Sequence, residues 1–329
     1  ASNNTAVGRA ALNANTTGNR NTAVGRDSGL GNTTASNNTS VGAYSLRTNQ
    51  TGIYNTAIGD SSFYNTTVSN NTGCGYAAGY RTTSGSNNTA IGSQALYENT
   101  TGTSNVAVGK DALDSNTTGN QNVSIGMDSM DSNTTGSNNV AIGYDALLAN
   151  TTGASNTAVG SGALSSLTTG VNNVAIGKNA NTTSTTGNSN IVIGEAAEPS
   201  SATVQLEITL GNAHITTLRC NTQTISSLSD GRDKTNIIDL PESLDFINKL
   251  RPVKFKWDSR DGNGKDGLYE HGFIAQDLQT AQKESDADYL NMVMDENPDR
   301  LEASYGKLVP ILTKAIQELS AKVIALEAG

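Results

Sequence analysis

Large apolar side chains are scarce in this chain of 329 residues. Aromatic residues make up 5% of it, whereas glycine, which has no side chain, occurs 34 times. So few bulky side chains cannot fill one large globular core. Most of the chain must therefore either remain disordered or stack a repeated unit on itself.

Basic residues, cysteines and long apolar runs are scarce as well. The net charge of −9 argues against nucleic acid as a partner, because phosphate contacts need clustered Lys and Arg. Cys74 and Cys220 alone form neither a disulfide framework nor a metal cluster, so we expect no metal and no cofactor. No apolar run reaches membrane-spanning length, so we expect no membrane insertion. Because the sequence starts at Ala1 without Met, we expect it to be part of a longer protein.

A repeat fills residues 1–198. Each copy has the form N-[TVI]-x-[VI]-G-x-x-x-L, followed by a polar stretch such as N-T-T-G. The spacing is 17 residues, except for one of 16 that results from a deletion in the polar stretch after Phe63. The copies open at Asn4, Asn21, Asn38, Asn55, Asn71, Asn88, Asn105, Asn122, Asn139, Asn156, Asn173 and Asn190.

The positions of the repeat describe one coil of a β-solenoid. Val or Ile stands three residues after the Asn in every copy but one, and we interpret this position, including the exception Cys74, as core. The Gly that follows indicates a corner with positive φ or a close approach of two backbones. A second large apolar residue, such as Leu46, stands eight residues after the Asn in most copies. Helical periodicity is absent.

Stacked coils share a thin continuous core that one coil cannot form. We expect the Asn and Thr residues of successive coils to align in hydrogen-bonded ladders. One chain has too few large apolar residues to be stable alone, so we expect three chains around a common axis. The N-T-A-[VI]-G pattern resembles the head repeats of trimeric autotransporter adhesins and phage fibre shafts, which supports a homotrimer and leaves the handedness of the coil open.

The predicted fold class is mostly β, in three regions. A solenoid shaft at 1–198 is followed by an extended β stalk at 199–228, for which a simple linker is the alternative. A small α+β domain follows at 229–329. Within it we expect a strand at Thr235–Leu240, a helix from Pro241, a strand at Val253–Trp257, a glycine-rich hairpin at Asp261, a strand at His271–Gln276 and a mobile acidic stretch.

The chain is expected to end in a long helix from about Leu308. Its apolar residues follow a 3-4-3-4-3 spacing, which predicts a coiled coil. The alternative is an amphipathic helix packed on its own domain. The seam consists of Val309, Leu312, Ile316, Leu319, Val323 and Leu326.

Four motifs in the last hundred residues resemble, in order, those of the intramolecular chaperone auto-processing domain. Domains of that family stand at the C-terminus of phage tail spikes and fibres, endosialidases included, and also occur in the myelin regulatory factors of animals. The resemblance implies a fibre of the extracellular virion tail, made in the host cytoplasm. Its partners would be other virion tail proteins and a host-surface glycan or protein. The motifs begin at Ser229 (SDGRDKTNI), Leu250 (LRPV), Gly272 (GFIAQD) and Ser304 (SYGKLVPIL).

The resemblance also implies a Ser-Lys endopeptidase that cleaves its own chain once. By position, the scissile bond is Leu228–Ser229, the nucleophile is Ser229 and the base is Lys234. The family often has an apolar residue where this chain has Asp233, whose charge would oppose the neutral amine unless the two side chains point to opposite faces of a strand. A lysine base must be neutral, which burial or nearby positive charge promotes.

Four further residues are candidates for supporting roles. Arg232 would favour the neutral amine, and His271 or Gln276 would stabilise the oxyanion, while Asp230 directly follows the nucleophile. A surface salt bridge, a polar strand end and a structural amide are equally ordinary interpretations of Arg232, His271 and Gln276. We expect Lys234 to lose its water only when three domains assemble around a folded fibre end, so cleavage would report completed folding.

Three other functions compete with this one. In a non-cleaving trimeric adhesin, the C-terminal domain would be only a trimerisation foot. An ice-binding solenoid is disfavoured because adjacent threonines point to opposite faces. A glycan-cleaving spike needs paired carboxylates in a groove, and the repeats contain only scattered acids such as Asp111, Asp128 and Asp145.

Overall fold

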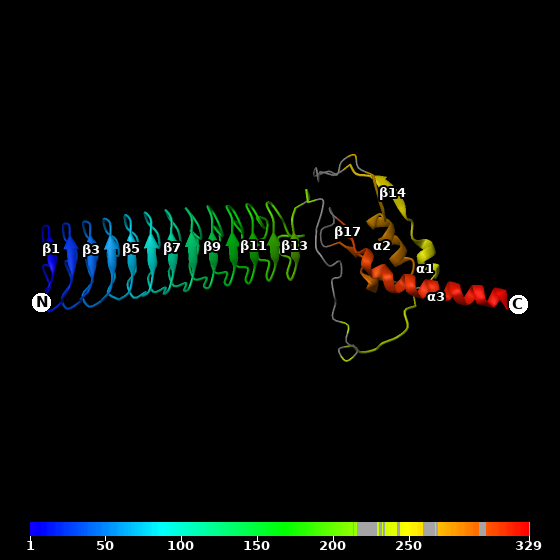
Figure 1. Cartoon of the computed structure of the whole chain (residues 1–329), viewed down its shortest axis with the longest axis horizontal. Coiled ribbons are helices and arrows are strands. Elements are labelled where there is room, and N and C mark those ends of the chain that lie inside the picture. The colour runs from blue at the N-terminus through cyan, green and yellow to red at the C-terminus, as the bar shows by residue number, and fades with distance from the viewer. Residues whose placement is uncertain are drawn as a thin grey trace. The chain divides into compact units, whose positions relative to one another are not determined.

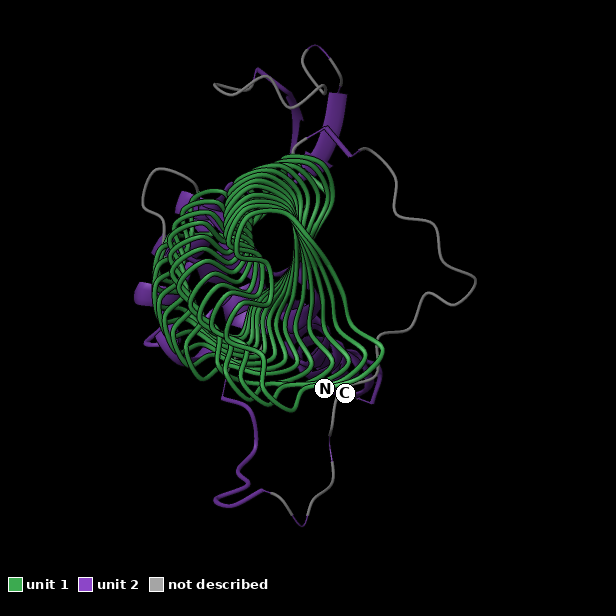
Figure 2. Cartoon of the chain, turned by 90° about the vertical axis from the view of Figure 1, so that its left-hand side faces the viewer, with its two compact units in different colours: residues 1–212 green, residues 213–329 purple. Residues whose placement is uncertain are grey.

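Two compact units, Ala1–Asn212 and Ala213–Gly329, make up the chain in a computed structural model (Figure 2). The structure describes residues 1–212, 214–215, 229, 232, 234–241, 244–258, 267, 269–295 and 301–328.

The first unit is a β-solenoid in which each coil contributes one three-residue strand to a parallel sheet. The strand order follows the chain order from β1 to β13, as Figure 1 shows. Paired residues are 17 positions apart, as in Thr89↔Val106, except at Thr56↔Thr72, where the spacing is 16. The predicted fold class and the shortened coil are confirmed. The strands are β1 (Thr5–Val7), β2 (Thr22–Val24), β3 (Thr39–Val41), β4 (Thr56–Ile58), β5 (Thr72–Cys74), β6 (Thr89–Ile91), β7 (Val106–Val108), β8 (Val123–Ile125), β9 (Val140–Ile142), β10 (Thr157–Val159), β11 (Val174–Ile176), β12 (Ile191–Ile193) and β13 (Ile208–Leu210).

The solenoid continues past the predicted boundary at residue 198. β13 pairs in parallel with β12, so Glu207-Ile-Thr-Leu-Gly211 is a thirteenth copy of the repeat. Its opening residue is Glu207 instead of Asn, and the Glu207 backbone N–H donates to Asn190 Oδ1 at 3.0 Å, as the repeat asparagine does elsewhere. Part of the predicted stalk therefore belongs to the solenoid, and residues 216–228 lie outside the described part of the chain.

From β2 to β12 the central residue of each strand is buried inside the coil, and the Val, Ile or Cys that follows it is not. Ala90 and Ala107 are fully buried, whereas Ile91 is 41% exposed and Cys74 is also exposed. The prediction that the Val/Ile column and Cys74 form the core is wrong. Neighbouring strand residues point to opposite faces, and the interior face of the sheet carries mostly small side chains, with Val192 as the largest.

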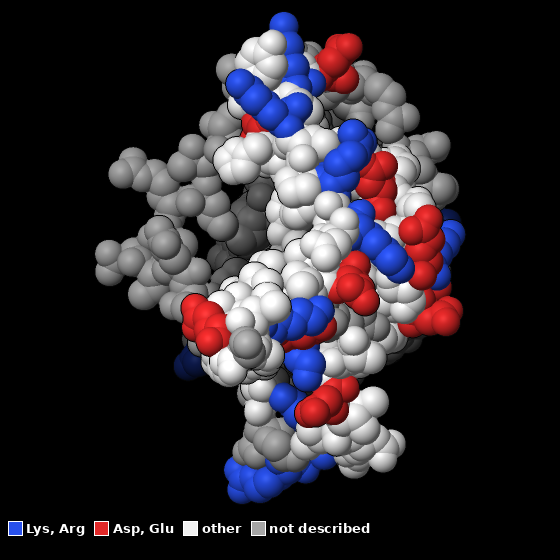
Figure 3. Space-filling model, turned by 90° about the vertical axis from the view of Figure 1, so that its right-hand side faces the viewer, with Lys and Arg blue, Asp and Glu red and all other residues white. Residues whose placement is uncertain are grey.

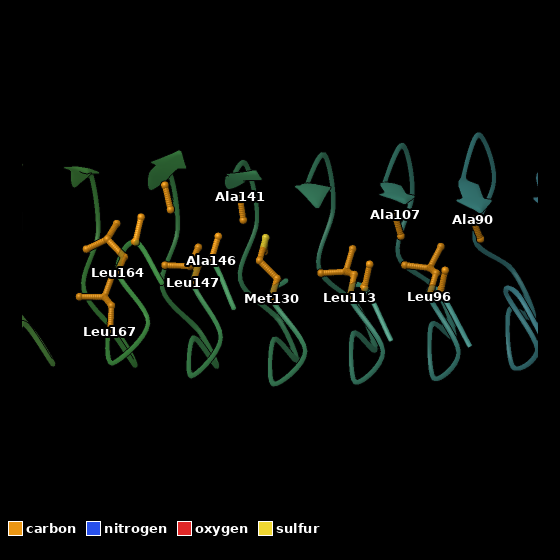
Figure 4. Close-up of a cluster of buried hydrophobic side chains, with 14 of the residues drawn as sticks. Ala90, Leu96, Ala107, Leu113, Met130, Ala141, Ala146, Leu147, Leu164 and Leu167 are labelled. Carbon is orange, nitrogen blue, oxygen red and sulfur yellow. The ribbon is translucent and has the colours of Figure 1, made fainter. Parts of the chain in front are cut away.

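The second predicted apolar column does form the core. The residues eight positions after the repeat asparagine stack along the coil interior (Figure 4). Each of them fills the space between two coils, opposite the buried alanines. The buried members are Leu46, Phe63, Leu96, Leu113, Met130, Leu147 and Leu164.

Polar ladders join successive coils, as predicted. The Asn105 backbone N–H donates to Asn88 Oδ1 at 3.0 Å, and Asn88 Nδ2 donates to the Gly102 carbonyl at 2.9 Å. Thr100 Oγ1 donates to the Thr117 carbonyl at 2.9 Å. Buried polar groups that one coil leaves without partners are thus satisfied by the next coil.

The invariant glycine meets both conditions that its position suggested. Gly92 has φ of 136°, and a Cβ at this residue would lie 2.3 Å from the Gly109 carbonyl oxygen of the next coil. Any other residue would therefore be strained and would also push two coils apart.

The second unit is a small α+β domain. Its core consists of Phe246, Leu278, Ala281, Ala287, Met292, Val293, Leu308 and Ile311. Charged side chains of both signs are interleaved on the face shown in Figure 3. Its elements are α1 (Leu244–Lys249), an antiparallel pair of β14 (Val253–Lys256) and β15 (Tyr269–Gly272), α2 (Ala275–Lys283), η2 (Asp288–Leu290), a second antiparallel pair of β16 (Val293–Met294) and β17 (Glu302–Ala303), η3 (Tyr305–Lys307) and α3 (Leu308–Glu327).

Local predictions for this unit need two corrections. Residues 235–240 form no strand, and they leave Ile237 and Ile238 exposed. The strand predicted at His271–Gln276 ends at Gly272, because the helix-favouring run from Ala275 opens α2 in place of the expected mobile stretch. The predicted glycine-rich hairpin at Asp261 lies outside the described residues.

The long terminal helix α3 has two apolar faces. Leu308, Ile311 and Ala315 are buried in their own unit, so the helix does pack on its domain. The predicted seam points away from that core, with exposures from 42% at Leu312 to 82% at Leu326. None of the helices in the described ranges is long and apolar enough to cross a membrane.

Candidate active site

Ser229 and Lys234 lie side by side at the start of the second unit. Lys234 Nζ donates to Ser229 Oγ at 2.7 Å and reaches the Ser229 carbonyl at 3.5 Å. The residues are five positions apart, and of the residues between them the structure describes Arg232.

Both side chains of this pair are exposed to solvent in the single chain. A hydroxyl that contacts an amine is the arrangement needed for proton transfer to a base and for nucleophilic attack. In the single chain, however, both groups are in contact with water. The geometry of the pair is therefore present, but the single chain provides no desolvation.

The predicted supporting residues lie at different places in the unit. Arg232 is exposed, His271 lies in β15 opposite Lys254, and Gln276 is the second residue of α2. Within the described part of the chain, no hydrogen bond joins His271 or Gln276 to Ser229. Three residues of the predicted site lie outside the described residues, namely Leu228, Asp230 and Asp233.

The motifs also contain structural contacts that the sequence reasoning missed. Arg251 Nη2 and Nε donate to Asp277 Oδ2 at 2.7 and 3.0 Å, which joins the second motif to the third. The Tyr305 hydroxyl donates to the Phe273 carbonyl and accepts from the Phe273 N–H, both at 3.1 Å, which joins the fourth motif to the third. In the sequence, these contacts are indicated only by the fact that their residues lie within the four motifs.

The contact between Tyr305 and Phe273 also explains why residue 272 is a glycine. A Cβ at this residue would lie 2.8 Å from the Tyr305 hydroxyl, so a side chain here would displace the tyrosine. Three of the four motifs therefore hold the fold of the unit together, while the first motif provides the hydroxyl and the amine. No group of three or more His, Cys, Asp or Glu in the described ranges could hold a metal ion.

Comparison with known proteins gives a family match for part of the second unit. Residues 229–286 match the family model described as chaperone of endosialidase, and the match begins at the serine of the first motif. No curated protein and no solved structure shows a significant match to this chain. This family implies a self-cleaving, peptidase-like domain. A segment similar to the chaperone of endosialidase thus follows a solenoid of 17-residue repeats, a combination that fits a phage fibre with a C-terminal chaperone domain.

Proposed function

We propose that this chain is a homotrimeric phage tail fibre or spike segment whose C-terminal domain aligns three chains and then removes itself by one autoproteolytic cut before Ser229. The observation that carries the proposal is the 2.7 Å contact between Lys234 Nζ and Ser229 Oγ, at the first residue of the family match.

In the proposed step, the neutral amine of Lys234 accepts the hydroxyl proton of Ser229. The oxygen attacks the carbonyl carbon of Leu228, and the Leu228–Ser229 C–N bond breaks as the proton passes to the leaving amine. The resulting ester is hydrolysed by water, which regenerates the hydroxyl and leaves two chains. Each molecule reacts once.

Assembly would control the timing of this step. In the single chain, Lys234 and Ser229 are both exposed to solvent, so the amine is not desolvated there. Three domains packed around the folded fibre end would exclude water from the amine and favour its neutral form. Cleavage would then follow trimer folding.

Two exposed apolar stripes support a trimer. The Val/Ile column runs the length of the solenoid sheet and is partly or largely exposed, from half-buried members such as Val108 to Val7 at 57%. The α3 seam is a second stripe in the other unit, with Ile316 at 66%. Extended apolar stripes are rare on monomers, and two further copies of the chain would cover both.

Self-removal would serve the stability of the fibre. Stacked strands in three chains can slip in register, and a C-terminal trimeriser sets the point where winding begins. After its removal, refolding is no longer accessible, and the fibre persists because its unfolding barrier is high. The exposed shaft would then attach to a host-surface glycan or protein in concert with other virion tail proteins.

The test is the product mass of the full chain expressed in bacteria. We expect two fragments split at Leu228–Ser229 from the unaltered chain and intact chains from Ser229→Ala, Lys234→Ala and Lys234→Arg. Lys256→Ala, which removes an exposed lysine of β14, is the matched control and should be cleaved. If the unaltered chain forms a trimer but stays intact, the C-terminal domain acts as a trimerisation foot and not as a peptidase.

A further inference from the structure

The coils of the solenoid differ from one another mainly in one segment, the turn after the invariant glycine. Positions 5, 6, 9 and 10 after the repeat asparagine carry all but three of the eighteen charged residues in the first unit. They also carry six of its seven tyrosines. The ladders and the core are shared by every coil, so this turn face is where one coil becomes chemically distinct from the next.

The chemistry of the turn face changes along the fibre. Residues 1–87 contain five arginines and two acidic residues. Residues 88–155 contain one lysine and six acidic residues. A basic zone is thus followed by an acidic zone.

Tyrosines and arginines of the basic zone, together with Tyr97 at the start of the acidic zone, form a continuous stripe. The ring centroids of Tyr64 and Tyr80 are 5.1 Å apart, and those of Tyr80 and Tyr97 are 5.2 Å apart with an interplanar angle of 7°. Arg26 lies 4.4 Å from the Tyr44 ring, and Arg47 Nη1 donates to the Tyr64 hydroxyl at 2.5 Å. We call this set the Arg–Tyr stripe, formed by Arg26, Tyr44, Arg47, Tyr64, Tyr80 and Tyr97.

The two arginines of the stripe retain their charge for a ligand. Arg9 pairs with Asp27 and Arg81 pairs with Glu98, so both are neutralised within the fibre. Among the described residues, neither Arg26 nor Arg47 pairs with a carboxylate, and Arg47 Nε is buried without an acceptor. The four rings are half-buried, so part of each remains accessible.

We propose that the Arg–Tyr stripe binds a linear acidic polysaccharide whose sugars carry carboxylates. A guanidinium binds a carboxylate through two parallel hydrogen bonds, and tyrosine offers an apolar ring edge and a hydroxyl to a sugar. Because three successive coils present a tyrosine ring at the same position, namely Tyr64, Tyr80 and Tyr97, a polymer with a regular repeat contacts several coils at once, and three chains multiply these contacts. The adjoining acidic zone repels the polymer and confines binding to the stripe. This inference rests on the proposed role as a fibre and names the ligand class of its shaft.

Retention of the cleaved fibre on immobilised polygalacturonate, a linear polyuronate, tests the proposal, with neutral dextran as the comparison polymer. We expect Arg26→Gln/Arg47→Gln to weaken binding at least tenfold. The matched control Arg9→Gln/Arg20→Gln removes the same charge from the same zone outside the stripe and should weaken it less than threefold. Tyr64→Phe/Tyr80→Phe, which keeps the rings and removes two hydroxyls, should weaken binding severalfold.

Equal losses in the two double arginine variants would overturn the proposal, because binding would then follow net charge alone. Equal binding to dextran, or no binding to polygalacturonate, would overturn it as well. Trimer mass and cleavage are read separately on each sample. A cleaved trimer without binding contradicts this inference only, whereas an uncleaved or monomeric chain contradicts the proposed function.

Discussion

Phe63 occupies the space that a side chain at Gly79 would need. A Cβ at Gly79 would lie 2.4 Å from Phe63 Cε1, and one at Gly73 would lie 2.7 Å from Phe63 Cδ2. The largest side chain of the solenoid core is thus matched by two glycines in the following coil, at positions where neighbouring coils have larger residues such as Ala90 and Leu96. Core volume in this fibre is shared between adjacent coils.

We predict that Gly79→Ala lowers the stability of the fibre. The added methyl group overpacks the core against a rigid ring, which costs about 1–3 kcal/mol per chain. Combining it with Phe63→Leu should give a smaller loss than the sum of the two single changes. Thermal unfolding of the unaltered chain, the two single variants and the double variant measures this coupling. Strictly additive losses of stability would show that the two residues do not share space.

Gly29→Ala should cost less stability than Gly79→Ala, although both glycines stand at the same position of the repeat. Gly29 has φ of 57°, close to the 64° of Gly79, so an alanine is strained at either residue. Gly29, however, borders a small cavity also lined by Leu12 and Leu46, and its nearest neighbour, Leu12 Cδ2 at 3.0 Å from the added Cβ, is the end of a flexible side chain. We expect a loss of about 1 kcal/mol per chain from the backbone strain alone, without the overpacking that Gly79→Ala adds. A loss as large as that of Gly79→Ala, measured by thermal unfolding, would contradict this.

The stacking and register of the solenoid could be predicted because asparagine and glycine recur at fixed positions. Which strand side chains point into the coil and which point outward could not be predicted. Large residues are normally buried, but here the coil interior beside the sheet holds Ala in most coils, and the Val or Ile that follows points outside. The thirteenth coil could not be predicted from the asparagine pattern, because Glu207 replaces the asparagine. Its backbone N–H nevertheless makes the same contact.

The Ser229–Lys234 pair followed from family resemblance and not from a pattern of residues. Contacts such as Arg251–Asp277 and Tyr305–Phe273 join segments that are distant in sequence. Periodicity describes only local structure, so such contacts become visible only in the folded unit.

The acidic zone predicts pH-dependent stability. Burial first, and then the charges of Asp131, Asp111 and Glu98, raise the pKa of Asp114 to about 7. Its ordinary value is about 3.9, so between about pH 4 and pH 7 the folded chain holds a proton that the unfolded chain lacks. The stability contributed by this protonated carboxyl is therefore lost as the pH rises through that window.

Asp114→Asn should raise the unfolding temperature at pH 8 and flatten its dependence between pH 4 and pH 7. Added salt should narrow the difference from the unaltered chain, because it screens the neighbouring acids. The control is Asp60→Asn, which changes an exposed acid that accepts from the Ser61 hydroxyl. An unchanged pH profile in Asp114→Asn would show that the carboxyl is ionised throughout.

Cys74 can report which face of the solenoid meets the trimer axis. It stands in the exposed column of β5, in register with Ile58 and Ile91 of the neighbouring strands. If the sheets of three chains face one another, the three Cys74 side chains converge at one height of the fibre. Disulfides form when two Cα atoms lie within about 7 Å, so oxidation should link pairs of chains.

The measurement is the fraction of covalent dimer on a denaturing, non-reducing gel in a Cys220→Ser background. Cys74→Ser should abolish the dimer, and Cys74→Ser with Ser93→Cys, which moves the thiol to the turn face, should not restore it. A dimer formed only through the cysteine at position 93 would place the turn face at the axis, and the Arg–Tyr stripe would then be covered.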